Sequence, residues 1–230
     1  MYNGFESLEA ARTSAQRIFD PFSYRVTSTE RAVPICLSEA PALAERWPVL
    51  WVRDASGEFD LVVLRGLQPG AEVPGLHSQS RTSLPLLLQA YPFRYRDLTS
   101  GGEIGLDRTA PMRERDAGAY IFDDRGGFPP GTDLKLRALD LWGEEIGLRA
   151  RLTAELFHHG LVEPVRLPGT LQERLELPDM FSALAFPEDV PIFRSIPATH
   201  WLTVARFLAA QRMSLYMMAR LISALPEGTA

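Results

Sequence analysis

The stretch WPVLWVRDASGEFDLVVLRGL, residues 47–67, carries the densest apolar patterning of the chain and decides the fold. Residues 49–53 and 59–65 are rich in β-branched and aromatic side chains, which favour strands. The turn between them contains Gly57, which can adopt the positive φ that tight turns require. The stretch therefore predicts an antiparallel β-hairpin, which we expect at the edge of a sheet.

Outside the hairpin, the first half of the chain alternates short apolar segments with turn residues. The segment TSLPLLLQAYPF, residues 82–93, predicts a buried connection. Pro34 marks the strand expected at 30–37 as an edge strand or a bulge, because proline cannot donate to a neighbouring strand. Further short strands are predicted by the patterns at 91–95, 103–107 and 119–122.

The second half follows a helical period. Apolar residues recur at helical spacing from Asp133 to Leu156 and predict one long amphipathic helix that Gly160 ends. Extended pieces at 162–167 and 171–177 and a helical turn at 178–186 are expected next. A second long helix closes the chain, and its apolar stripe consists of Trp201, Val204, Leu208, Leu215, Met218 and Ile222.

These patterns predict an α+β fold in which an antiparallel sheet from the N-terminal half packs against two long helices from the C-terminal half. Residues 1–29 are expected to form an N-terminal helix and extension, with the helix over residues 1–20, and residues 30–230 a single domain. A composition of 46% apolar and 23% charged residues is typical of a packed globular protein and excludes a disordered chain.

Charge and cysteine content exclude several classes of protein. A net charge of −5 opposes nucleic-acid binding, which needs a basic face. The single cysteine, Cys36, excludes an internal disulfide, and we interpret it as a buried apolar residue. No secretory signal pattern begins the chain, and the apolar segment 201–225 is interrupted by Arg206, Arg212 and Arg220. We therefore expect a cytoplasmic protein without a membrane span.

Glu155 and His158 have the Glu-x-x-His spacing that carboxylate-bridged metal centres use on a helix. Such centres draw a second copy of the motif and two more glutamates from other helices, and the sequence holds no second copy. The alternative, which we favour, is a solvated helix end with His158 and His159 near the negative end of the helix dipole. No cofactor is therefore predicted, and non-haem iron is kept as the alternative.

The remaining histidines and paired glycines give no catalytic signature. His77 and His200 could meet in space as acid and base, but neither belongs to an arrangement with Ser, Cys or Asp that would single it out, so we interpret both as surface histidines. Asp123-Asp124 lacks the alternating acidic positions of a calcium loop, so we interpret it as a turn. The glycine pairs lack the strand, loop and helix context of a phosphate site.

The last helix is apolar on more than one face. Met213, Tyr216, Met217 and Met218 widen its apolar surface. Core packing by adaptable thioethers is one interpretation, and a surface shared with a second copy or with another protein is the other. We take the candidate partner-binding residues to be Trp201, Met213, Tyr216 and Met217.

An ordered set of short motifs runs through residues 30–190. It consists of Ser38-Glu39, Trp47-Pro48-Val49-Leu50-Trp51-Val52-Arg53-Asp54, Gly57-Glu58-Phe59, Leu64-Arg65-Gly66-Leu67, Leu84-Pro85, Tyr91-Pro92-Phe93, Asp107, Ala119-Tyr120-Ile121-Phe122-Asp123, Thr153, Phe157, Gly160-Leu161, Pro164, Leu175, Pro178-Asp179 and Phe181. In this order the motifs resemble the SapC-like proteins. Ser80-Arg81 and Gln89 stand where the family is expected to have a Trp and an Arg, so the chain is identified as a divergent member.

The resemblance implies a bacterial protein from a family named after a surface-layer secretion locus, many of whose members resemble companions of oxygenases or flavin-dependent halogenases. It implies no catalytic residue. We therefore expect a non-catalytic accessory protein that holds a partner protein or peptide in a secretion or biosynthetic pathway, with a homo-oligomer kept open. The alternative is a metal-dependent oxidative or tailoring enzyme that uses Glu155 and His158 with one or more of His77, His159 and His200.

Overall fold

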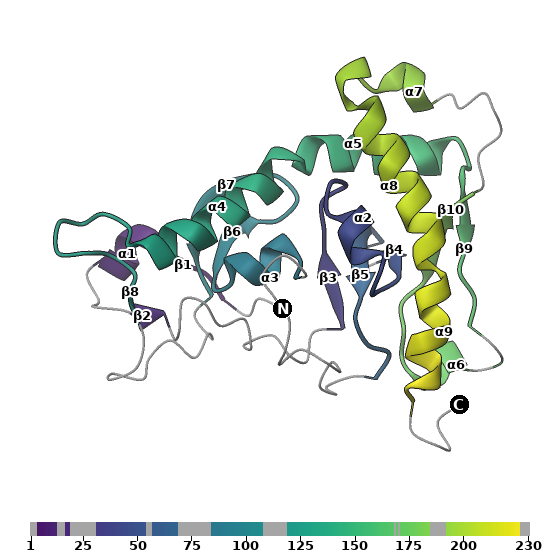
Figure 1. Ribbon diagram of the computed structural model, residues 1–230, viewed down its shortest axis with the longest axis horizontal. Coiled ribbons are helices and arrows are strands. Elements are labelled where there is room, and N and C mark those ends of the chain that lie inside the picture. Colours follow the sequence, from purple (N-terminus) through teal and green to yellow (C-terminus); the bar gives the residue numbers. More distant parts are fainter. Residues whose placement is uncertain are drawn as a thin grey trace. The chain divides into compact units, whose positions relative to one another are not determined.

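The structure is a computed structural model that describes residues 4–12, 17–18, 31–53, 57–68, 84–107, 119–167, 169, 171–184 and 192–225. The chain forms two compact units, each built from segments that are distant in the sequence. Unit 1 consists of Met1–Ser28 and Leu76–Ile146, and unit 2 of Thr29–Gly75 and Gly147–Ala230. Figure 1 labels their helices and strands. The expected single domain over 30–230 stays a prediction.

Within the described residues, unit 2 contains a five-stranded antiparallel sheet. Its strands, in spatial order, are β3 (Ala32–Pro34), β5 (Phe59–Leu64), β4 (Val49–Arg53), β10 (Met180–Ala183) and β9 (Val162–Pro164). The predicted hairpin is present, with Trp51 opposite Leu61 and Gly57 at a φ of +90°. The expected position at a sheet edge is wrong, because β4 and β5 lie inside the sheet and β3, with Pro34, forms one edge.

The central position of β4 follows from its burial. Val49, Leu50 and Trp51 are all 0% exposed, so both faces of the strand are covered. Continuous apolar runs of this kind suit strands that have protein on both sides, whereas an edge strand facing water alternates apolar and polar residues. The hairpin could reach this position only because β10, far away in the sequence, pairs with its free side.

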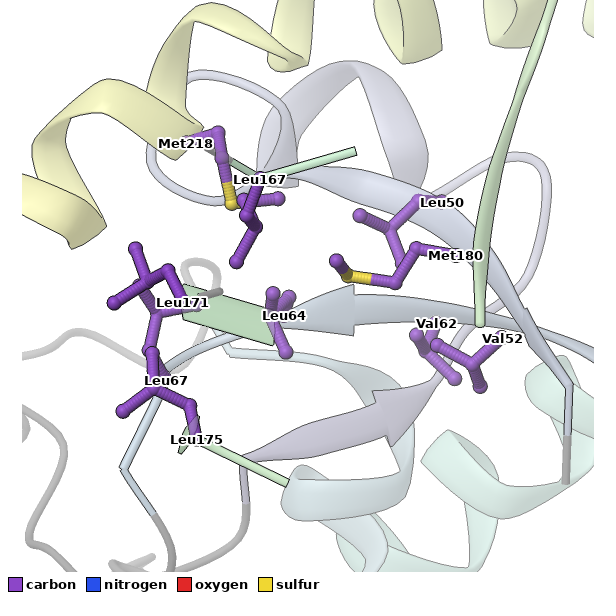
Figure 2. Packing of buried hydrophobic residues seen from close by; sticks show 10 residues of the cluster. All are labelled: Leu50, Val52, Val62, Leu64, Leu67, Leu167, Leu171, Leu175, Met180 and Met218. Atoms are coloured by element: carbon purple, nitrogen blue, oxygen red, sulfur yellow. The ribbon is translucent and has the colours of Figure 1, made fainter. Parts of the chain in front are cut away.

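One face of this sheet packs against the segment between β9 and β10. Figure 2 shows the cluster, which consists of Leu50, Val52, Val62, Leu64, Leu67, Leu167, Leu171, Leu175, Met180 and Met218. The prediction of an extended piece at 171–177 is wrong, because Leu171–Arg174 forms helix α6. The predicted helical turn at 178–186 is also wrong, because it contains strand β10. Pairing with β4 and burial of Met180 outweigh the local pattern there.

The helices of unit 2 are α2 (Ala40–Leu43), α5 (Ile146–His158, whose first residue closes unit 1), α6, α7 (Ile192–Ser195), the 3₁₀ helix η4 (Ala198–His200), α8 (Trp201–Ser214) and α9 (Tyr216–Ser223). The predicted last helix is present but divided at Leu215. Ser214 Oγ donates to Gln211 O at 2.6 Å, and Leu215 N donates to Arg212 O instead of continuing the α-helical pattern. The serine hydroxyl thus explains the division.

Unit 1 contains the hairpin of β6 (Phe93–Asp97) and β7 (Gly101–Leu106), with β1 (Glu6–Ser7) on the other side of β7. A separate pair is formed by β2 (Arg17–Ile18) and β8 (Ala119–Tyr120). Its helices are α1 (Leu8–Arg12), α3 (Leu86–Ala90) and α4 (Pro130–Glu144). The prediction of one helix over residues 1–20 is wrong, since α1 is flanked by strands.

Close backbone contact explains why β1 can pair with β7. A Cβ atom on Gly105 would collide with Glu6 O and the Phe5 ring, so only glycine fits there.

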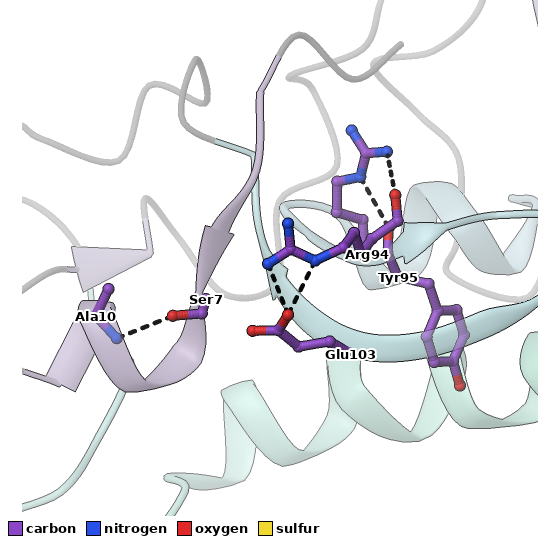
Figure 3. Close-up of polar contacts among 6 residues, drawn as sticks. Ser7, Ala10, Arg94, Tyr95 and Glu103 are labelled. Atoms are coloured by element: carbon purple, nitrogen blue, oxygen red, sulfur yellow. Dashed lines mark hydrogen bonds and ion pairs between the residues drawn. The ribbon is translucent and has the colours of Figure 1, made fainter.

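Ser7 Oγ accepts a hydrogen bond from Ala10 N at 3.2 Å and so begins α1 (Figure 3). Glu103 on β7 accepts two hydrogen bonds from Arg96, at 2.9 and 2.7 Å. In Figure 3 the two dashed lines that end on Glu103 mark these bonds.

The first predicted long helix is likewise divided, here at Glu145 between α4 and α5. Glu145 has φ −98° and ψ 0°, outside the α-helical region. Gly143 and Gly147 flank it, and glycine lowers helix stability by about 1 kcal/mol relative to alanine. A Cβ atom on Gly143 would collide with the Tyr95 side chain, so glycine allows α4 to pack closely on β6 while it weakens the helix where it ends.

Candidate functional site

The inner side of α8 is fixed to the ends of two strands. Gln211 Nε2 donates to Val49 O at 3.0 Å, and Gln211 Oε1 accepts from Ala183 N at 3.1 Å. In the register of β4 and β10, Trp51 pairs with Phe181, and continuation of this register would pair Val49 with Ala183. That pair is not formed, and the side-chain amide of Gln211 bonds the two backbone groups instead. Ser214 Oγ accepts from Val49 N at 2.8 Å, and both side chains are fully buried. The orientation of α8 about its axis is therefore fixed.

The opposite side of the same helices is exposed and largely apolar. We call the α8–α9 outer face the set of exposed residues Leu202, Ala205, Arg206, Ala209, Met213, Tyr216 and Arg220. Tyr216 is 78% exposed, Met213 69% and Leu202 63%. Burying a side chain of this size contributes about 1.5–3 kcal/mol, so this face can stabilise a contact with another molecule. A depression of about 470 Å³ is lined by Arg212, Met213, Leu215 and Tyr216.

Two of the four predicted partner-binding residues lie at this depression. Met213 and Tyr216 line it together. Trp201 lies twelve residues from Met213, or about 18 Å along a helix, and its Nε1 donates to Ile196 O at 3.0 Å. Met217 is half-buried, and its Sδ accepts from Arg220 Nη1 at 3.8 Å. Trp201 and Met217 therefore flank the outer face, and Met213 and Tyr216 form its centre.

The charge of these helices is of one sign. Residues 201–225 include Arg206, Arg212 and Arg220 and no Asp or Glu. Arg212 is engaged within unit 2, because its Nη1 lies 2.6 Å from Glu163 Oε1 and donates to Ala183 O at 3.0 Å. Arg206 and Arg220 are exposed on the outer face. Among the residues that the structure describes, no helix is long and apolar enough to cross a bilayer.

The outer face contains residues that sequence reasoning missed. Leu202, Arg206, Ala209 and Arg220 were not predicted as part of the site. The core stripe of the helix is formed by the buried residues Val204, Leu208 and Met218. A second helical stripe beside this core stripe is the signal in the sequence that could have found the missed residues.

The predicted metal pair has another arrangement. Glu155 Oε2 lies 3.3 Å from the Nε2 atom of His159, the first residue after α5, and no ion pair joins Glu155 to His158 among the described contacts. The rings of His158 and His159 are in edge contact, with centroids 5.0 Å apart. Within the described ranges, no three His, Cys, Asp or Glu side chains gather as a metal site. His200 is exposed at the end of η4, and His77 lies outside the described residues.

A second depression, of about 600 Å³, lies between β9, α6 and β10. Its charged lining residues carry both signs and are all exposed; they are Arg166, Glu173, Glu176 and Asp179. Gln172 Nε2 donates to Pro178 O at 3.1 Å and so closes the segment on itself. Exposed charges of mixed sign define no ligand there.

Comparison with protein families identifies the chain, since the sequence model of the SapC family matches residues 8–183. The chain belongs to the SapC family. No curated protein and no solved structure matches it significantly. The match ends at the last residue of β10, so α8 and α9 lie beyond the matched part of this SapC chain.

In unit 2 of this SapC protein, motif residues that are far apart in the sequence form one aromatic cluster. Trp51 Nε1 donates to Thr153 Oγ1 at 3.0 Å, and the Trp51 ring meets Phe157 edge-on with centroids 6.3 Å apart. Phe157 stacks on Phe59 at 3.7 Å and meets Phe181 edge-on at 5.5 Å. These side chains join the hairpin, α5 and β10, so these SapC motifs hold the sheet of unit 2 together.

In unit 1 a second set of SapC motif residues surrounds the Tyr91–Pro92 bond, which is cis. Tyr91 Oη donates to Asp107 Oδ2 at 3.3 Å, and Asp107 N donates to Pro92 O at 3.0 Å. Lys135, the only lysine of the sequence, donates from Nζ to Tyr91 O at 2.8 Å. Gln89, which stands where an arginine is expected in the family, donates from Nε2 to Leu84 O at 2.7 Å. All these side chains are buried, so they support the fold of unit 1.

Proposed function

We propose that this SapC-family chain is a non-catalytic accessory protein that holds a partner protein or peptide on the α8–α9 outer face. The exposure of Met213 and Tyr216 beside a depression is the observation that carries the proposal. Large apolar side chains gathered on one face mark contact sites in soluble proteins, whereas single exposed apolar residues need no explanation. Methionine and tyrosine are also enriched in protein interfaces.

The way in which α8 is held supports the proposal. Gln211 and Ser214 bind the strand ends, and Met218 is buried in the core, so the inner side of α8–α9 is already occupied. The outer face is thus a second apolar surface of the same helices, presented in one orientation. A preorganised surface binds more tightly because less conformational entropy is lost on contact. We propose that this binding serves a bacterial secretion or biosynthetic pathway in the cytoplasm.

The test is co-purification from the native host followed by native mass spectrometry. The wild-type chain of 25.7 kDa is expected to carry a second chain in fixed stoichiometry. The double variant Met213→Ser/Tyr216→Ser should lose this chain. The control Leu141→Ser changes another exposed apolar residue, 53% exposed on α4, and should retain it. A wild-type protein without a second chain, or a double variant that keeps it, would contradict the proposal.

A further inference from the structure

The outer face has the spacing of a surface that packs along another helix. Its residues Leu202, Arg206, Ala209, Met213, Tyr216 and Arg220 recur at alternating intervals of four and three. This alternation keeps side chains on one seam over several turns, as in helices that pair side by side. Leu215 retains helical angles, φ −61° and ψ −25°, and Figure 1 shows α8 and α9 end to end. The seam therefore continues across the division.

The charge of the seam indicates what it would attract. Arg206 and Arg220 lie on the seam, and residues 201–225 contain no acidic residue, although the whole chain carries a net charge of −5. The local charge is thus opposite to that of the protein. Charged groups around an apolar contact select a partner of opposite sign and speed its association.

A second copy of the chain fits this seam poorly. Arg206 and Arg220 lie seven residues before and seven residues after Met213. Antiparallel pairing centred on Met213 would place Arg206 of each copy opposite Arg220 of the other, and parallel pairing would place each arginine opposite itself. Both arrangements oppose like charges at two points, which destabilises pairing. The occupant must therefore supply negative charge.

We infer that the α8–α9 outer face receives an acidic amphipathic helix of another protein, an inference that rests on the proposed binding function. The seam from Leu202 to Arg220 spans about 27 Å, the length of a helix of some eighteen residues. The helix lays apolar side chains over Ala209, Met213 and Tyr216. Glu or Asp near its two ends pair with Arg206 and Arg220. Each exposed ion pair of this kind changes affinity by about 1.4- to fivefold.

A displayed library of 24-residue amphipathic helices tests the inference. Leucine is fixed along one seam, and the flanking positions are randomised among Glu, Lys and Ser. Selection on the wild-type protein is expected to enrich Glu over Lys. Selected peptides should bind the double variant Met213→Ser/Tyr216→Ser at least about tenfold more weakly, because the apolar centre of the seam is lost.

Charge reversal supplies the decisive comparison. Selection on Arg206→Glu/Arg220→Glu should enrich Lys over Glu. The control Arg137→Glu/Arg151→Glu makes the same change of net charge at exposed positions outside α8 and α9, and should still enrich Glu. No enrichment on the wild type, or the same preference on the reversed variant, would overturn the inference. A host partner that Met213→Ser/Tyr216→Ser releases would still support the proposed function, so the two failures are distinguishable.

Discussion

Gln211 receives the backbone N–H of Ala183 on its side-chain oxygen, 3.1 Å away, at the point where β10 parts from β4. The other end of the same amide donates to Val49 O on β4. A side chain of α8 thus bonds two backbone groups, Ala183 N and Val49 O, that do not bond each other through strand pairing. Because buried backbone groups without partners are costly, this contact couples the sheet to the helix whose outer face is the candidate site.

The first prediction concerns this amide. Gln211→Leu keeps the side chain similar in size, but it removes the partner of Ala183 N and leaves Val49 O with only the longer, 3.4 Å hydrogen bond from Ser214 Oγ. A buried backbone group that loses its partner costs about 1–3 kcal/mol, so the free energy of unfolding, from urea titration, should fall by about 1–4 kcal/mol. Gln172→Leu is the control, because Gln172 is only half-buried and bonds one carbonyl through one atom. Equal losses in both variants would show that the Gln211 bridge has no special role.

A methionine pair tests which side of the helices is exposed. Met213 is 69% exposed and Met218 7% exposed, five residues further along. Met218→Ala removes a side chain from the core and should lower the free energy of unfolding by about 2–4 kcal/mol. Met213→Ala should change it by no more than about 0.5 kcal/mol, since exposed substitutions rarely matter. Thermal or urea unfolding of both variants measures the difference, and a comparable loss for Met213→Ala would mean that its side chain is buried.

Local sequence could predict the elements but not their neighbours. The apolar runs of 49–53 and 59–65 and the glycine between them are enough for the β4–β5 hairpin. Its central position depends on β10, which begins at Met180 and whose own sequence suggested a helical turn. Pairing between segments that are far apart in the chain leaves no local trace, and this is why the sheet edge was misjudged.

The same distinction applies to the candidate site. Helical spacing could predict the buried stripe through Val204 and Leu208, and the excess of apolar residues pointed to Met213 and Tyr216. The division at Leu215 could not be predicted, because Ser214 accepts from Val49 N, a residue 165 positions away. The same holds for Trp201, whose Nε1 donates to Ile196 O. Only the fold determines this hydrogen bond, so the sequence could not show that the indole N–H is already occupied.

Lys135 provides a chemical probe of unit 1. It is the only lysine, it is 1% exposed, and its Nζ donates to Tyr91 O. An amine-acylating reagent should therefore leave Lys135 unmodified in native buffer and modify it once urea unfolds unit 1. Peptide mass spectrometry measures the modification, and a lysine-containing peptide added to the same reaction serves as the control for reagent activity. Rapid native modification of Lys135 would contradict its burial.

The last prediction is a dependence of stability on alkaline pH. Burial raises the pKa of Tyr95 above its ordinary value of 10.0, and the carboxylates of Asp140 and Glu144 on α4 raise it further. The unfolded chain therefore releases the Tyr95 proton at a lower pH than the folded chain does. The contribution of Tyr95 to stability is complete below pH 10.0 and is lost as the pH rises through the folded pKa.

Tyr95→Phe isolates this contribution, since it removes the ionisable hydroxyl and keeps the ring that packs near Trp142, with centroids 6.4 Å apart. Urea titrations of both proteins at about pH 8 and about pH 11 give the difference in unfolding free energy at each pH. The free energy of unfolding of the wild type should fall more between these two pH values than that of Tyr95→Phe. The reason is that the folded wild type holds the Tyr95 proton more tightly than the unfolded chain does, whereas the variant has no hydroxyl at this position. A difference that does not change with pH would show that Tyr95 ionises as freely in the folded chain as in the unfolded one.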